Sequence, residues 1–334
     1  MKPSEFTIRQ AAGQRIMAGF YGTNLNRDLK HLIDTILVGG IILFSRNIED
    51  REQVRRLCRD AQVYAKSCNQ PKLFIAVDQE GGSVVRLKAP DFFEPPAASQ
   101  IRDTPSAGKY AEVTASELNS LGINMNMAPV MDVASPCETS VMAERSFSGD
   151  PLRVAEAGGA VIDALQKNNI MAVAKHFPGI GRTTLDSHLD LPELEISLAR
   201  LEECDLVPFY TAVRHKTAGI MLSHVRYPGL DRVWPASLSA LIAGDLLRER
   251  MGYQGLTITD DLEMGAIGEH FDMQTAICQI IAAEIDMALV CHSMEKIESA
   301  FKTFLSEPAD EDETAGSNAS ILRIMKTKNR YLCC

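Results

Sequence analysis

The chain lacks the long apolar runs and the basic character that mark membrane and nucleic-acid-binding proteins. No stretch approaches the roughly 20 apolar residues that span a bilayer, and the first residues carry charges too often to form a signal peptide. The net charge of −10 at pH 7 disfavours a nucleic acid or an anionic membrane as partner. We therefore expect a cytoplasmic protein, monomeric or weakly dimeric, that acts on a neutral or modestly charged small molecule.

Recognisable metal and phosphate motifs are also absent. The eight cysteines include no CxxC pair and no spacing typical of a zinc site, so we expect free thiols. The side chains that could in principle bind a metal are His176, His188, His224, Asp78 and Asp260. No HxH or HExxH arrangement accompanies them, and Lys175 beside His176 would repel a cation. Neither DQEGGSVVR nor PGIG is a complete phosphate-binding motif, so the sequence predicts no metal and no cofactor.

Short apolar or β-branched runs recur along the chain and indicate a parallel sheet. Amphipathic stretches separate them, at 51–66, 154–168, 198–215 and 239–251. The clear runs are 38–45, 72–78, 123–130, 171–177, 219–225, 255–261 and 286–293, and a weak eighth lies at 191–196. Eight strand–helix units close a (β/α)8 TIM barrel, and an open doubly wound sheet is the alternative.

Nothing in the composition divides the 334 residues into separate domains. There is no Pro/Gly/Ser-rich linker and no internal repeat. The one shift in composition is the acidic segment 306–318, which we expect to be a solvated loop before a final helix at 320–332. The sequence therefore predicts a single α/β barrel domain over 1–334.

Polar residues gather at the C-terminal ends of the predicted strands. Asp78, Lys175 with His176, His224 and Asp260 each end or follow such a run. In a barrel these ends converge on the face that carries the active site. Each residue alone has a structural explanation, as a helix cap or a hydrogen-bonded core histidine, but their coincidence favours a site.

The spacing of two pairs bears on how their side chains point. Asp260 and Asp261 are adjacent, so only one can face the barrel interior, and alternation alone does not say which. Asp186 and His188 are two apart, so in an extended segment they project from the same side. A carboxylate so placed orients the imidazole and favours its protonated form, as a general acid near neutral pH requires.

Several blocks, in their order and spacing, resemble the family 3 glycoside hydrolases. They are DQEGGSVVRL, INMNMAPVMDV, ERSFSGDP, KHFPGIG followed by DSHLDLP, PASLS and GLTITDDLEMGAI. The likeness runs from about Gly39 to Cys291, and KHFPG and TDDLEM are its most specific parts. Without a second domain, the chain is similar to the single-domain bacterial β-N-acetylglucosaminidases of cell-wall recycling.

The resemblance implies a retaining enzyme that removes terminal β-linked N-acetylglucosamine from peptidoglycan-derived muropeptides through a covalent glycosyl-enzyme. Asp260 matches the family nucleophile. His188, with Asp186 as its partner, matches the family acid/base on the loop after strand four. The positions that match the family's sugar contacts are Asp78, Arg86, Arg145, Lys175 and His176.

Three positions depart from the family pattern, and several alternatives stay open. The family usually has Arg at Ser83, His at Ile180 and a small residue at Glu284. None of these is the nucleophile or the proton donor, so we expect activity to persist. The alternatives are substrate-assisted hydrolysis, phosphorolysis, a broader β-glycosidase, and a sugar-binding barrel without catalysis. Retention of the three residues matched to catalysis argues against the last.

Overall fold

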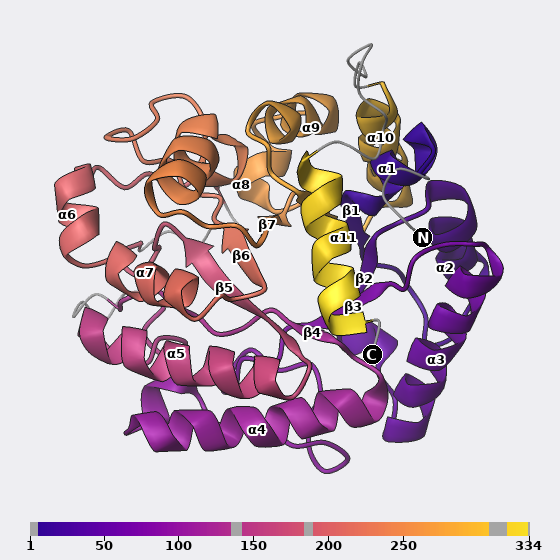
Figure 1. Ribbon diagram of the computed structural model, residues 1–334, viewed down its shortest axis with the longest axis horizontal. Helices are drawn as coiled ribbons and strands as arrows, with labels where there is room; N and C mark the ends of the chain where they lie inside the picture. The colour runs from indigo at the N-terminus through magenta and orange to yellow at the C-terminus, as the bar shows by residue number, and fades with distance from the viewer. Residues whose placement is uncertain (1–5, 135–141, 184–189, 307–318, 333–334) are drawn as a thin grey trace.

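Eight parallel strands close into a barrel in sequence order, as predicted (Figure 1). The computed structural model describes residues 6–134, 142–183, 190–306 and 319–332. The first strand pairs with both the second and the eighth, which closes the sheet. The strands are β1 (Ile16–Ala18), β2 (Gly40–Leu43), β3 (Phe74–Val77), β4 (Met125–Asn126), β5 (Met171–Phe177), β6 (Gly219–Leu222), β7 (Leu256–Asp261) and β8 (Met287–Val290).

Helices surround the barrel, and polar caps begin most of them. Asp50 and Asp103 each accept a hydrogen bond from the backbone N–H three residues on, and Asp150 precedes Pro151 in the first turn of its helix. The helices are α1 (Ile8–Gln14), α2 (Arg27–His31), η2 (Leu32–Ile36), α3 (Arg51–Ser67), α4 (Thr104–Leu121), α5 (Pro151–Lys167), α6 (Leu198–Glu203), α7 (Leu206–Arg214), η6 (Leu241–Arg250), α8 (Gly265–Gly268), α9 (Met273–Ala282), α10 (Met294–Leu305) and α11 (Ala319–Leu332), with short 3-10 turns η3 (Ser45–Asn47), η4 (Ala98–Gln100) and η5 (Ala236–Leu238). No helix among the described residues is long and apolar enough to cross a membrane.

Two sequence predictions about the elements are wrong. The expected strand at 191–196 contributes only one isolated bridge, between Glu193 and Arg226, and lies outside the barrel. The missing strand is β1, so the loop that begins with KHFPG follows the fifth strand and not the fourth. The stretch 198–215 forms two helices, α6 and α7, because the chain leaves helical geometry at Cys204.

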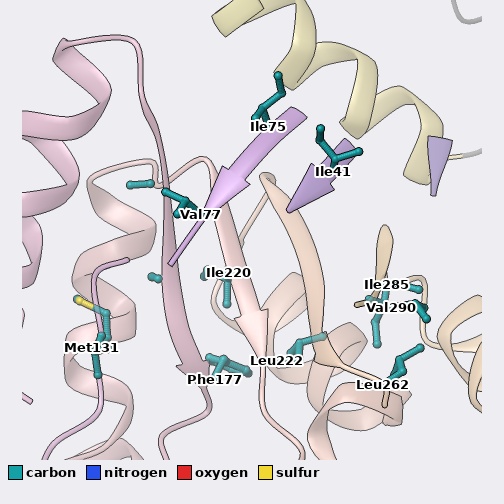
Figure 2. Close-up of a cluster of buried hydrophobic side chains, with 14 of the residues drawn as sticks. Ile41, Ile75, Val77, Met131, Phe177, Ile220, Leu222, Leu262, Ile285 and Val290 are labelled. Carbon is teal, nitrogen blue, oxygen red and sulfur yellow. The ribbon is translucent and has the colours of Figure 1, made fainter. Parts of the chain in front are cut away.

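The outer faces of the strands pack against the surrounding helices and form the larger hydrophobic core. Figure 2 shows side chains of this core, among them Ile41, Ile75 and Val77 from neighbouring strands. The intervening residues of the same strands belong to a second buried cluster, which includes Phe74 and Ala76. Because side chains alternate along a strand, this second cluster is the barrel interior.

Helix α11 closes the N-terminal end of the barrel and lies across the strands in Figure 1. Ile321, Ile324 and Met325 pack into the interior cluster. Lys328 is buried beside them, where its Nζ donates to the Gly39 carbonyl at 2.8 Å and to Gln14 Oε1 at 2.7 Å. The opposite, C-terminal end is therefore the open mouth of the barrel.

The cysteine prediction holds for the described residues. The thiols of Cys58, Cys68, Cys204, Cys278 and Cys291 are free. Cys137, Cys333 and Cys334 lie outside the described residues. The acidic segment 307–318 lies outside them as well, while the final helix predicted at 320–332 is α11.

Candidate active site

Alternation along the strands places Asp260 inside the barrel mouth. Leu256 and Ile258 belong to the interior cluster, so Asp260 continues the same face of β7. Asp261 points the other way, where its Oδ1 accepts the N–H of Glu263 at 3.1 Å. The sequence left open which of the two side chains faces the barrel interior. In the structure Asp260 faces inward, and Asp261 faces outward and stabilises the turn after β7.

A cluster of buried charges fills one side of the mouth. Lys175 Nζ lies 2.8 Å from Asp78 Oδ1 and 2.6 Å from Glu80 Oε1. Arg86 Nη2 donates to Asp78 Oδ2 at 3.2 Å. Arg145 holds Glu80 with two hydrogen bonds, of 2.9 and 2.8 Å. The two carboxylates and three cations come from β5 and the loops after β3 and β4, and each carboxylate bridges two cations.

The pKa values of Glu80, Asp78 and Lys175 follow from these ion pairs. Burial alone would raise the pKa of Glu80, but Lys175 and Arg145 outweigh it and lower that pKa to about 2. The pKa of Asp78 is lowered because Lys175 and Arg86 likewise outweigh burial. Burial acts to lower the pKa of Lys175, and the two carboxylates raise it instead. All three groups are therefore charged at neutral pH.

A further carboxylate, Asp132, fixes the imidazole of His176. His176 Nδ1 lies 2.7 Å from Asp132 Oδ2, and the same carboxylate accepts the backbone N–H groups of His176 and Ile180. The other ring nitrogen, Nε2, lies 3.4 Å from Arg145 Nη2. Because Asp132 is completely buried, it sets the ring's orientation and leaves Nε2 on the side of the charged cluster.

Asp260 lies near this cluster as a half-buried carboxylate. Its Oδ1 accepts the backbone N–H of Asp261 at 2.8 Å, and no described residue donates a hydrogen bond to its Oδ2. Burial acts to raise the pKa of Asp260, but His224, His176 and Lys175 outweigh it and hold that pKa below its usual value. Asp260 is an ionised carboxylate with one oxygen held and one oxygen available.

His224 is a structural histidine beside the site. Its Nε2 lies 2.9 Å from the Asp261 carbonyl oxygen, which can only accept, so Nε2 donates and Nδ1 accepts from the Ser237 hydroxyl at 2.7 Å. Burial lowers the pKa of His224. The ring joins the segment after β6 to β7 and fixes the backbone that carries Asp260.

The structure brings together most of the predicted site residues and leaves one pair untested. Asp78, Arg86, Arg145, Lys175 and His176 are linked through direct contacts with one another or through Glu80. Asp186 and His188 lie outside the described residues.

Two residues of the site were missed by the sequence reasoning. Glu80 is two positions after Asp78, so strand alternation could have placed both on one face. Asp132 stands in APVMDV, a block that the resemblance already contained. No local signal pairs Asp132 with His176, since 44 residues separate them.

The departures from the family pattern lie outside the charged cluster, and Glu284 precedes β8 at the opposite end of the barrel. The Ile180 side chain is buried in the outer hydrophobic core, and its N–H bonds to Asp132. Ser83 is exposed, and it directly follows Gly82, whose backbone is in the left-handed conformation. Glu284 has a φ of 50°, a left-handed conformation that favours glycine.

Comparison with known proteins assigns the family. Residues 7–319 match the Glycosyl hydrolase family 3 N terminal domain. The chain is 35% identical to Beta-hexosaminidase A of Pseudoalteromonas piscicida, over 92% of this chain and 56% of that protein. It is 36% identical to a Beta-hexosaminidase of Pseudomonas aeruginosa, over 85% of this chain and 84% of that protein. The chain thus spans little more than half of the first relative and most of the second.

Solved structures agree with this assignment. A family 3 β-N-acetylglucosaminidase from Paenibacillus superposes with a TM-score of 0.91 at 34% identity, covering 98% of this chain and 63% of that one. NagZ from Neisseria gonorrhoeae, in complex with N-trifluoroacetyl-D-glucosamine, gives a TM-score of 0.79 at 31% identity, covering 93% and 89%. The barrel described here is therefore similar to both.

Proposed function

Since the chain belongs to glycoside hydrolase family 3, we propose that it is a retaining exo-β-N-acetylglucosaminidase acting through a covalent intermediate on Asp260. Relatives named beta-hexosaminidase and a NagZ complex with a glucosamine derivative support this substrate class. The observation that carries the proposal is the geometry of Asp260, whose Oδ1 is held while Oδ2 is left without a described donor. A nucleophilic carboxylate needs this combination of fixed orientation and a free lone pair.

The charged cluster would bind the sugar. Hydroxyl groups can donate to the carboxylate of Asp78 and accept from Arg86, Arg145 and Lys175, and such charge-assisted hydrogen bonds are strong. His176 Nε2, held in place through Asp132, adds a ring nitrogen on the same side. These contacts would set the anomeric carbon opposite Asp260, which is the positioning that an enzyme uses to lower the barrier.

His188 is proposed as the proton donor, with Asp186 as the carboxylate that orients it. Retaining glycosidases usually employ a second carboxyl group for this task. Among the described residues, Asp78 and Glu80 are both committed to cations and ionised, so neither is suited to donate a proton. This supports a donor from elsewhere in the chain, which the D-x-H pair supplies by its spacing.

Asp260→Asn tests the nucleophile, and Asp261→Asn is its matched control. We expect Asp260→Asn to lower kcat on an aryl N-acetylglucosaminide by about 10³-fold or more. Asp261→Asn keeps the acceptor for Glu263 and faces away from the mouth, so we expect it to stay within about tenfold of the native rate. Equal losses in the two variants would contradict the assignment.

A fluorinated donor sugar separates the possible mechanisms. Trapping its mass on the peptide that contains Asp260 supports a covalent intermediate on that residue. Turnover without any label, accompanied by an oxazoline product, points to substrate-assisted hydrolysis instead.

Assays with and without phosphate distinguish hydrolysis from phosphorolysis. Release of sugar 1-phosphate only when phosphate is present would identify the enzyme as a phosphorylase.

The leaving group and the sugar are tested separately. Aryl glycosides that differ only at C2 should react faster with an acetamido group than with a hydroxyl, and similar rates would favour a broader β-glycosidase. Release of N-acetylglucosamine from a purified muropeptide tests the proposed natural substrate class. A cytoplasmic location stays a prediction of the sequence.

A further inference from the structure

A hollow opens at the end of the barrel opposite the active site. Its volume is about 350 Å³, which lies within the range of small-molecule sites. Three segments line it: residues 213–218 before β6, residues 252–255 before β7, and one face of α11. Because these residues precede the strands, the hollow lies on the N-terminal face, separated from Asp260 by the filled barrel interior.

The charge of this hollow contrasts with that of the chain. Lys216, Lys326 and Arg330 line it, and no acidic residue does. The net charge of the whole chain is −10. Within the described part of the chain, neither Lys216 nor Lys326 forms an ion pair, and Arg330 contacts the ring of Tyr331 at 4.9 Å. Three cations around one concavity, none of them in an ion pair with a described residue, create a positive potential that attracts anions.

A buried hydroxyl in the hollow's wall lacks a partner. Tyr331 is 8% exposed, and its hydroxyl has no hydrogen-bond partner among the described residues. Burial raises the pKa of Tyr331, so the hydroxyl stays protonated and can donate. Buried polar groups are nearly always paired with protein or water, so this hydroxyl is available to a partner that reaches it. The neighbouring Tyr253 differs, since its hydroxyl donates to the carbonyls of Thr217 and Leu256.

We propose that this hollow binds a small organic anion, with a phosphate or carboxylate group among the three cations and an apolar body against its floor. Val213, Ala218 and the ring of Tyr253 supply apolar surface. The Tyr331 hydroxyl donates to the bound anion and so gains the partner it lacks. This anion site is distinct from the proposed sugar site, and evidence for or against it does not depend on the proposed function.

Calorimetric titration of the native chain with phenyl phosphate and with benzoate tests the proposal. We expect saturable binding of at least one in the millimolar range or tighter, weakened by added salt because the contacts are electrostatic. Phenol alone should not bind. The stronger of the two anions identifies whether phosphate or carboxylate is preferred.

Three variants locate the binding. Lys326→Gln with Arg330→Gln removes two rim charges and should weaken affinity about tenfold. Lys302→Gln removes an exposed charge on α10, away from the hollow, and should leave affinity unchanged. Tyr331→Phe should weaken binding while the free protein melts at the same temperature or higher, because it removes an unpaired buried hydroxyl.

These measurements leave clear grounds for rejection. Binding that is absent in the millimolar range, or that is equal in the rim variant and in Lys302→Gln, overturns the proposal. So does a Tyr331→Phe protein that melts lower without losing affinity, since the hydroxyl would then serve the fold. Melting temperatures of all variants without ligand exclude unfolding as the cause of lost binding.

Discussion

Replacing Lys175 by Met should destabilise the protein strongly, and more so at neutral than at acid pH. The Lys175 ammonium is buried and lies 2.8 Å from Asp78 and 2.6 Å from Glu80. Met has a similar length but no charge, so the variant leaves both buried carboxylates with one cation fewer. Removing one partner of a buried ion pair typically costs about 3–5 kcal/mol.

The pKa of Glu80 gives the size and sign of the pH effect. Its folded value of about 2 lies below the ordinary 4.5. A carboxyl group with a lowered folded pKa adds stability above its unfolded pKa and loses that stability as pH falls through the folded one. For Glu80 the contribution is about 3 kcal/mol at pH 7 and about 1 kcal/mol at pH 3. The difference between native and variant proteins should therefore shrink between pH 4.5 and 2.

Urea unfolding at pH 7, 5 and 3 measures this difference, with Glu80→Gln and the double variant completing a cycle. If Lys175 and Glu80 stabilise each other, the double variant loses less than the sum of the two single variants, by about 1–3 kcal/mol. A loss at pH 7 below about 1 kcal/mol, or a loss that is the same at pH 7 and pH 3, would refute the reasoning. Additive losses would show that Arg145 alone holds Glu80.

Two further substitutions probe buried groups whose environments differ. Lys328 is buried and has no carboxylate partner among its contacts, and burial lowers its pKa to about 7, well below the usual 10.5. Because the pKa in the folded state is lowered, the charged side chain destabilises the fold fully below pH 7. This destabilisation decreases as pH rises from 7 toward 10.5. Lys328→Met should therefore raise the free energy of unfolding by about 1–2 kcal/mol at pH 6 and by less at pH 9, and a gain that grows with pH in urea titrations would contradict this. Asp132→Asn should lower kcat/KM on an aryl N-acetylglucosaminide about tenfold, because an amide holds the His176 imidazole less strongly than a carboxylate does; steady-state kinetics check this, and an unchanged kcat/KM would count against a role for that ring.

The barrel could be predicted from the sequence because its strands are buried on both faces and so read as apolar runs. The predicted runs at 72–78 and 255–261 contain β3 and β7. β1 was not predicted because it has only three residues and closely follows the apolar residues of α1. The segment 191–196 misled because Leu, Pro and Ile alternate with Glu, which is typical of a half-exposed strand and not of a barrel strand.

The site was predictable where a strand carries it and unpredictable where loops do. The strand-end rule correctly placed Asp78, Lys175 and Asp260 at one end of the barrel, since their positions follow from alternation and parallel direction alone. The pairing of Arg145 with Glu80 spans 65 residues and joins two loops, so no local pattern encodes it. Only the closed barrel brings such loops together, which is why candidate residues could be predicted from the sequence while their network of contacts could not.

The environment of Asp260 leads to a last prediction, on the pH dependence of catalysis. The pKa of Asp260 is lowered below its usual value of 3.8, so this carboxylate is ionised at neutral and mildly acid pH and takes up a proton only as pH falls below 3.8. Asp78 and Glu80 are ionised over the same range. Asp260, Asp78 and Glu80 therefore impose no acid limb on kcat/KM near pH 5 to 6.

If a histidine donates the proton, kcat/KM should stay level from about pH 5 downward to the onset of acid unfolding and fall as pH rises through the donor's pKa, near 6.5 for an ordinary imidazole. Initial rates on an aryl N-acetylglucosaminide with a poor leaving group would show this base limb, and an activated leaving group, which needs no proton, should remove it. His188→Ala should remove the limb in the same way with the activated substrate still turned over. A base limb that survives in His188→Ala would place the proton donor on another residue, and an acid limb above pH 5 would mean that Asp260 is not held ionised by Lys175 and its neighbours.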